Sequence, residues 1–188
     1  DSSLEQDKEK YQYSYEDIIG MLQANVKLID VHQTIDLFWD MFIVDAFIAN
    51  FDRHGSNWGF IKKDNMYRLS PVFDNGSSLF PQLNSDEKID AVLGSQEEID
   101  KCIYKFPTSQ VKYMGKKSSY YEIISSLAFE ECNKALARIV ERIDLEKVNK
   151  LIDTVENISE KRRFFYKTIL EQRYEKILLN AYNKFVYH

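Results

Sequence analysis

The order of apolar and polar positions predicts a mainly helical chain. Apolar residues recur at three- and four-residue steps over residues 15–22 and again over 32–50, where further apolar residues flank the stripe. This spacing is typical of helices, and the apolar flanks indicate that the second helix is buried on most sides. Asn50 is expected to end that helix, because Asn tolerates the left-handed conformation.

One β-hairpin interrupts the helices. Two short segments rich in aromatic and apolar residues, 58–61 and 66–69, flank the polar turn Lys62-Lys63-Asp64-Asn65. This is the only strong strand signal in the chain. Everything beyond residue 84 is expected to be helical. The helices predicted there cover residues 85–93, 96–104, 120–127, 130–143, 145–155 and 160–185.

The domain organisation predicted from length and composition is simple. With 188 residues, of which 44% are apolar, the chain is long enough for one domain with a substantial core. Residues 1–10 are polar and lack the periodicity that would attach them to that core, so we expect a flexible lead-in or linker there. The folded domain is expected to occupy residues 11–188.

Composition and charge argue against several classes of function. The formal charge is −5 and there is no long basic run, which disfavours direct binding of nucleic acid. The two cysteines, Cys102 and Cys132, form no zinc or disulfide pattern. The longest apolar run, residues 35–48, is too short and too acidic to span a membrane, and no signal peptide opens the chain. We therefore expect a cytoplasmic protein without a membrane partner.

The candidate chemistry lies on the loop that follows the buried helix and on the segment beyond the hairpin. Asp52 could accept the proton of a hydroxyl group, and the side-chain oxygens of Asn57 and Asp74 are the hard ligands that Mg²⁺ prefers. His54, on the same loop, could fix its geometry. We predict Asp52, His54 and Asn57 as catalytic residues, and Asn57 and Asp74 as ligands of Mg²⁺ and of the ATP that it accompanies.

Plainer interpretations of the same residues exist. Asp, Asn and Gly are the usual residues of a polar connection between a helix and a strand. Asp45 lies on the apolar stripe of the preceding helix and is expected to be a buried, hydrogen-bonded carboxylate that could brace the loop. The lysines between Lys105 and Lys117 could line a substrate groove, although an ordinary surface is the more common role.

The segment from Phe47 to Ser78 resembles the catalytic region of the HipA-like serine/threonine kinases of bacteria. The resemblance rests on the D-x-H-x-x-N loop, which that family shares with phosphatidylinositol kinases, and on the later Val-Phe-Asp-x-Gly. It implies the helical C-terminal lobe of a protein-kinase-like (HipA/phosphatidylinositol-kinase-like) fold, with one small hairpin at the catalytic site. It also implies a catalytic loop at 50–57 and a metal-binding segment at 72–76. Asp52 would then be the catalytic base, and Asn57 and Asp74 the Mg²⁺ ligands.

The resemblance also implies parts that this chain lacks. No glycine-rich loop and no strand lysine that could anchor ATP phosphates precede Asp52. We therefore expect a fragment whose nucleotide-covering lobe lies upstream, and which has little activity alone. Ser56 stands where some relatives have a basic residue, and no Phe follows Asp74 as in a D-F-G switch.

Three functions remain open at this point. The first is a protein serine/threonine kinase that uses ATP and Mg²⁺ on a protein hydroxyl, its own included. The second is a non-catalytic, kinase-derived module that docks a protein such as an antitoxin-like repressor. The third, a phosphohydrolase using Asp52, His54 and Asp74, is the weakest, because binuclear hydrolytic sites usually gather more His and acid ligands.

Overall fold

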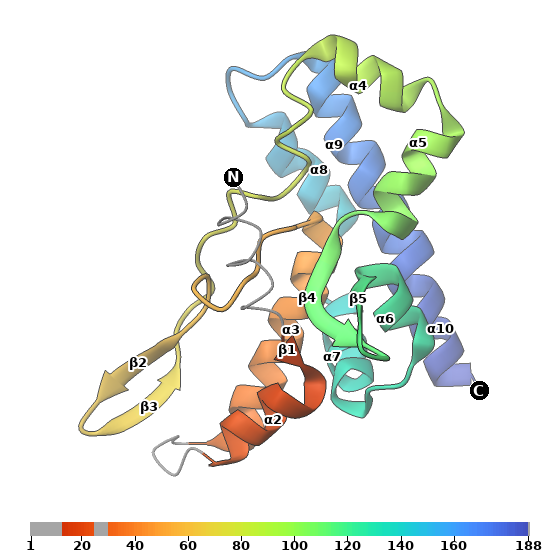
Figure 1. Ribbon diagram of the computed structural model, residues 1–188. Helices are drawn as coiled ribbons and strands as arrows, with labels where there is room; N and C mark the ends of the chain where they lie inside the picture. Colours follow the sequence, from red (N-terminus) through yellow and green to blue (C-terminus); the bar gives the residue numbers. More distant parts are fainter. Residues whose placement is uncertain (1–12, 25–29, 188) are drawn as a thin grey trace, which may run out of the picture.

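The computed structural model describes residues 13–24 and 30–187, and their arrangement is mainly helical (Figure 1). In chain order the elements are β1 (Tyr13–Ser14), α2 (Tyr15–Ala24), α3 (Val31–Ile48), β2 (Phe60–Lys63), β3 (Met66–Leu69), α4 (Asp86–Leu93), α5 (Gln96–Asp100), the π-helical η1 (Lys101–Lys105), β4 (Thr108–Tyr113), β5 (Lys116–Ser119), α6 (Tyr120–Ser126), α7 (Glu130–Val140), α8 (Leu145–Asp153), α9 (Glu160–Arg173), the π-helical η2 (Tyr174–Leu179) and α10 (Asn180–Tyr187). The expected lead-in over residues 1–10 lies outside the described residues.

Helix α3 is the centre of the core and packs against α7, α9 and η2. Asp30 caps its start by accepting a hydrogen bond from the Gln33 amide, and its end is set by Ala49, whose φ of 55° is left-handed. The expectation that Asn50 would end the helix is therefore wrong by one residue. The Asn50 side chain is instead buried, and its Nδ2 donates a hydrogen bond to Asp45 Oδ1 at 2.9 Å.

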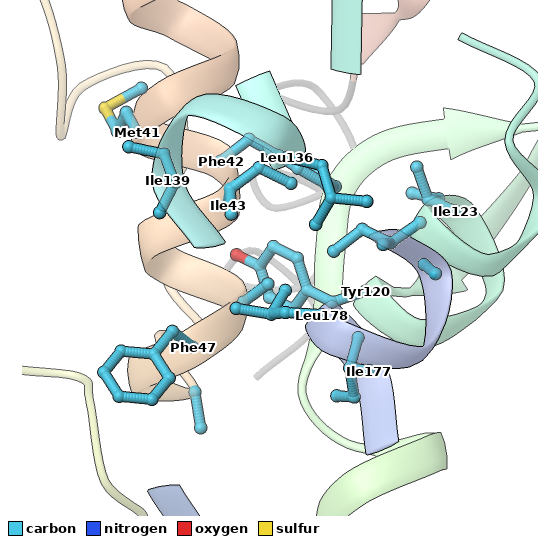
Figure 2. Close-up of a cluster of buried hydrophobic side chains, with 14 of the residues drawn as sticks. Met41, Phe42, Ile43, Phe47, Tyr120, Ile123, Leu136, Ile139, Ile177 and Leu178 are labelled. Carbon is cyan, nitrogen blue, oxygen red and sulfur yellow. The ribbon is translucent and has the colours of Figure 1, made fainter. Parts of the chain in front are cut away.

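Apolar side chains from three other elements meet on α3. Figure 2 shows residues of α3 facing side chains of α6, α7 and η2. The labelled members of this cluster are Met41, Phe42, Ile43, Phe47, Tyr120, Ile123, Leu136, Ile139, Ile177 and Leu178. Because the helix that leads into the candidate site is held by the core, its last turn is a rigid platform for that site.

Ile43→Ala tests this packing. Ile43 is 0% exposed, so the substitution leaves a cavity, and we expect the free energy of unfolding to fall by about 2–5 kcal/mol. Val44, the next residue, is 37% exposed, and Val44→Ala should change stability by only about 0.5 kcal/mol. Denaturant unfolding followed by circular dichroism measures both. Equal losses for the two variants would contradict the central position of α3.

The structure has two small sheets, so the expectation of a single hairpin is wrong. Strands β2 and β3 form the predicted antiparallel hairpin, which projects away from the helices in Figure 1. Strands β4 and β5 form a second antiparallel pair, and β1 adds to β4 in parallel. The second hairpin escaped prediction because its strands are mostly polar, with Val111 the one strongly apolar residue before Tyr113. Its turn is made by Met114 and Gly115, both with positive φ.

The helices predicted beyond residue 84 are all present. Several begin with a side-chain cap that accepts a hydrogen bond from the backbone three residues later, as is usual for Ser and Asp at this position. These caps are Ser85, Ser95, Ser119, Asp144 and Ser159. The helix predicted over 160–185 is continuous in direction (Figure 1) but changes to π-helical geometry over η2. No helix within the described residues is long and apolar enough to cross a membrane.

Candidate active site

The loop that carries Asp52 and Asn57 is folded by its own hydrogen bonds. The Asp52 carbonyl accepts from the His54 amide at 2.9 Å and from Asn57 Nδ2 at 2.6 Å. The Asn57 amide donates in turn to the His54 carbonyl at 2.9 Å. Since Asn57 uses its amide nitrogen to close the loop, its Oδ1 is left as an acceptor for another partner.

His54 contacts both ends of the same loop. Its Nδ1 accepts from the Ser56 amide at 3.2 Å, which assigns the proton of the neutral ring to Nε2. Nε2 lies 3.8 Å from the Asp52 carboxylate. That distance is too long for a hydrogen bond. The Asp52 side chain is 39% exposed and thus open to a substrate.

The segment that carries Asp74 runs beside this loop. The Phe51 amide donates to the Ser77 carbonyl at 3.3 Å, and the Leu79 amide donates to the Ile48 carbonyl at 2.9 Å. Asp74 itself is exposed and has a left-handed φ of 54°. This conformation is uncommon for residues other than Gly, and Asp and Asn tolerate it better than most.

Arg53 joins the two segments, and sequence reasoning missed it. Its guanidinium donates to the carbonyls of Asn57, at 2.7 Å, and of Phe73, and to Asn75 Oδ1 at 2.5 Å. Asp74 therefore lies between two residues that are both bound to Arg53. Its position next to the predicted catalytic residue Asp52 was the one signal in the sequence, and nothing there indicated its partners.

The charge of Arg53 is balanced by Asp45 of α3. Arg53 Nε and Nη2 donate to the two oxygens of Asp45 at 2.8 and 3.0 Å, and both side chains are almost fully buried. Burial alone would lower the pKa of Arg53, but the hydrogen bonds and the charge of Asp45 outweigh burial and raise it. Asp45 is thus the buried carboxylate that the sequence predicted, and it braces the loop through Arg53.

Tyr120, the first residue of α6, completes the support. Its hydroxyl donates to the Asn50 carbonyl at 2.9 Å, at the junction of α3 and the loop. Burial, together with the negative charge of Asp45, raises the pKa of Tyr120 well above its usual range. The phenol therefore stays protonated and remains a hydrogen-bond donor at physiological pH.

The donor set fits one Mg²⁺ ion that shares its coordination with phosphates. Asn57 and Asp74 offer an amide and a carboxylate oxygen, whereas residues 13–24 and 30–187 contain no cluster of three or more His, Cys, Asp or Glu side chains suited to a metal. Protein sites for Mg²⁺ commonly use one or two carboxylates plus substrate phosphates. The lysines considered for a substrate groove, Lys112, Lys116 and Lys117, lie on the β4–β5 hairpin.

Comparison with known proteins assigns the family. Residues 2–161 match the model of the HipA-like C-terminal domain. Over 150 residues the chain is 39% identical to the serine/threonine-protein kinase CtkA of Helicobacter pylori (strain J99 / ATCC 700824). This alignment covers 78% of the present chain and 46% of that kinase. The crystal structure of a Helicobacter pylori proinflammatory kinase CtkA matches with a TM-score of 0.88 and 33% identity, over 94% of this chain and 65% of that one.

These matches confirm the expected fold, a mainly helical lobe like the corresponding part of CtkA. The chain spans about half the length of the curated relative, at 46%. Sequence match, structural likeness and the shared architecture agree, and the chain belongs to the family of HipA-like C-terminal domains.

Proposed function

We propose that this chain is the catalytic-loop-bearing lobe of a serine/threonine protein kinase that transfers the γ-phosphate of ATP to a protein hydroxyl, with its own hydroxyls among the acceptors. The observation that carries the proposal is the Arg53 junction, which ties the Asp52–Asn57 loop to the Asp74 segment. The likeness to CtkA, which is named as a serine/threonine kinase, supports the same reaction class.

In the proposed reaction, Asp52 acts on the acceptor hydroxyl. The hydroxyl oxygen forms a bond to the γ-phosphorus, its proton passes to the Asp52 carboxylate, and the bond from the γ-phosphorus to the bridging oxygen breaks with its electron pair leaving on ADP. In this proposal His54, whose Nε2 lies 3.8 Å from that carboxylate, would orient it. The partly exposed position of Asp52 allows an acceptor side chain to approach.

Asn57 and Asp74 would hold Mg²⁺ through Asn57 Oδ1 and the Asp74 carboxylate. When bound, the ion neutralises charge on the ATP phosphates. Asn57 Nδ2 keeps its oxygen in place by binding the Asp52 carbonyl, and Arg53 holds the residues on both sides of Asp74. The loop and the segment are thereby oriented before substrate arrives, which is how such sites gain most of their rate enhancement.

Asp74→Asn in the full-length protein tests the proposal. The change keeps the shape and the tolerance of positive φ but removes the one charged ligand. We expect the Mg²⁺ concentration for half-maximal phosphate transfer to rise by about tenfold or more. Transfer is measured with ATP labelled on its γ-phosphate, followed by identification of labelled Ser and Thr.

Asp64→Asn is the matched control, since Asp64 is also an exposed aspartate with positive φ (51°) but lies in the β2–β3 turn. Its Mg²⁺ requirement should equal that of the wild type. If Asp74→Asn also leaves the requirement unchanged, Asp74 is not a ligand. If the full-length wild type neither binds Mg·ATP nor transfers phosphate, the alternative function replaces the proposal: a kinase-derived module that docks a protein such as an antitoxin.

A further inference from the structure

Arg173, the last residue of α9, is a buried cation whose partners are backbone carbonyls. It is 0% exposed. Its Nε donates to the Ala46 carbonyl at 2.7 Å, and its Nη1 donates to the Cys102 carbonyl. Across the described ranges, 13–24 and 30–187, no carboxylate forms an ion pair with it. Burial lowers the pKa of Arg173 to about 10, so the side chain is still charged at neutral pH.

The Ala46 carbonyl needs a donor because of how α3 ends. In a continuing helix the Asn50 amide would donate to it. The left-handed turn at Ala49 instead directs the Asn50 amide to the Asp45 carbonyl, at 3.0 Å. Ala46 lies in the last turn of α3, where the helix dipole is negative, and a cation is favourable there. Arg173 thus donates to the Ala46 carbonyl the hydrogen bond that no backbone amide provides.

The Cys102 carbonyl needs a donor for a related reason. It lies in η1, where the backbone donor five residues on would be residue 107, and Pro107 has no N–H group. The amide four residues on, that of Phe106, already donates to the Lys101 carbonyl at 2.8 Å. A buried carbonyl without a partner is costly, so a side-chain donor is required. The second arm of the Arg173 guanidinium meets that need.

Both of these helix ends lead to the loop of Asp52. The end of α3 continues directly into Phe51 and Asp52. The end of η1 continues into Phe106, whose ring lies 5.8 Å from the ring of Phe51 at an interplanar angle of 35°. Phe51 is therefore held from one side by the chain that precedes it and from the other by an aromatic neighbour. Among the residues that the structure describes, only Arg173 has a side chain that binds the backbone of both supports.

We propose that Arg173 is a positioning residue for phosphoryl transfer: its guanidinium joins the last turn of α3 to the last turn of the continuous α5–η1 helix and so fixes the start of the catalytic loop. The inference rests on the proposed role of Asp52, although the joining of the two helix ends can be tested without any catalysis. Arg suits this position because its planar fork presents two donors in a fixed geometry, which a lysine ammonium lacks.

Arg173→Lys keeps the charge but provides one nitrogen for two carbonyls. The test is amide hydrogen exchange of the full-length protein, followed by mass spectrometry. We expect exchange over residues 46–57 and 102–107 to become about tenfold faster or more, while exchange over α8 stays as in the wild type. In the same variant kcat for phosphate transfer should fall by a larger factor than KM for ATP rises, because the start of the loop, which carries Asp52, loses its support, whereas Asn57 at the far end of the loop is still held by Arg53.

Arg163→Lys is the matched control. Arg163 is also on α9 and donates to backbone carbonyls, those of Ile152 and Val155 at the end of α8. Its replacement should accelerate exchange at the end of α8 and leave residues 46–57 unchanged. The neutral variant Arg173→Gln gives a second measurement of the same kind. The proposal is overturned if exchange over 46–57 is unchanged, if exchange rises equally throughout the molecule, or if both Arg173 variants fail to fold.

An absence of phosphate transfer in the wild type, with the expected exchange pattern in Arg173→Lys, would reject the kinase function while leaving the joining of the two helix ends supported. Phosphate transfer in the wild type with an unchanged kcat in Arg173→Lys would reject the positioning role and retain the kinase.

Discussion

Asp52→Asn is expected to lower kcat for phosphate transfer by roughly 10²–10⁴-fold, the usual contribution of a positioned general base. The amide of Asn has nearly the same shape as the carboxylate but cannot accept the hydroxyl proton. The hydrogen bonds that fold the loop use the backbone of Asp52, so they survive the substitution. KM for ATP and the Mg²⁺ requirement should therefore stay near their wild-type values.

The measurement is the initial rate of transfer by the full-length protein over a range of ATP concentrations. Asp52→Glu adds a second comparison, because it restores a carboxylate but displaces it by one methylene, and its kcat should lie between those of the wild type and Asp52→Asn. Asp64→Asn again serves as the surface control. A wild-type rate for Asp52→Asn would remove Asp52 from the mechanism.

Arg53→Met is expected to lower the free energy of unfolding by about 3–5 kcal/mol, because it leaves the Asp45 carboxylate buried without its cation. The same substitution releases the Asn57 and Phe73 carbonyls and Asn75. Phosphate transfer should therefore be lost even at temperatures where the variant is fully folded. Denaturant unfolding and initial rates, measured on the same preparation, separate the two effects.

A double variant distinguishes stability from positioning. Asp45→Asn combined with Arg53→Met removes both charges while keeping an acceptor for Asn50 Nδ2, so it should regain much of the lost stability without regaining activity. Arg138→Met is the control for an ion pair to the same helix, since Arg138 of α7 binds Asp36 and Asp40 of α3 but is 32% exposed, and its loss should cost less than about 1 kcal/mol. Recovery of phosphate transfer in the double variant would show that Arg53 matters only for stability.

The parts of the fold that sequence predicted are those with local signals. The buried stripe of α3, the aromatic hairpin and the capped helices each have a periodicity or a cap within a few residues. The β4–β5 hairpin was missed because polar strands carry little periodic signal, and their pairing partners are chosen by tertiary contacts. The change of the last helix to π-helical geometry was also missed, because the residues of η2 are ordinary helix formers and carry no local signal for it.

The candidate site divides in the same way. Asp52, His54, Asn57 and Asp74 were identifiable because a short loop carries three of them and a recognisable segment carries the fourth. Their roles stay predictions. Asp45 was identifiable as a polar residue on an apolar stripe. The partners of Arg53 and Arg173 were not identifiable. Arg53 binds the side chains of Asp45 and Asn75 and two carbonyls, and Arg173 binds two carbonyls distant along the chain, which no local pattern indicates.

The bond from Arg173 to Ala46 spans 127 residues, which has a consequence for biosynthesis. A ribosome makes the loop of Asp52 long before it makes Arg173, so the growing chain carries its candidate catalytic residues while the end of α3 still lacks its last donor. A nascent or prematurely terminated chain that stops within α9 therefore contains every predicted catalytic and metal-binding residue without this support. If Arg173 positions the loop as proposed, the site is complete only after residue 173 has been synthesised, and a shorter chain would carry the predicted residues without this support.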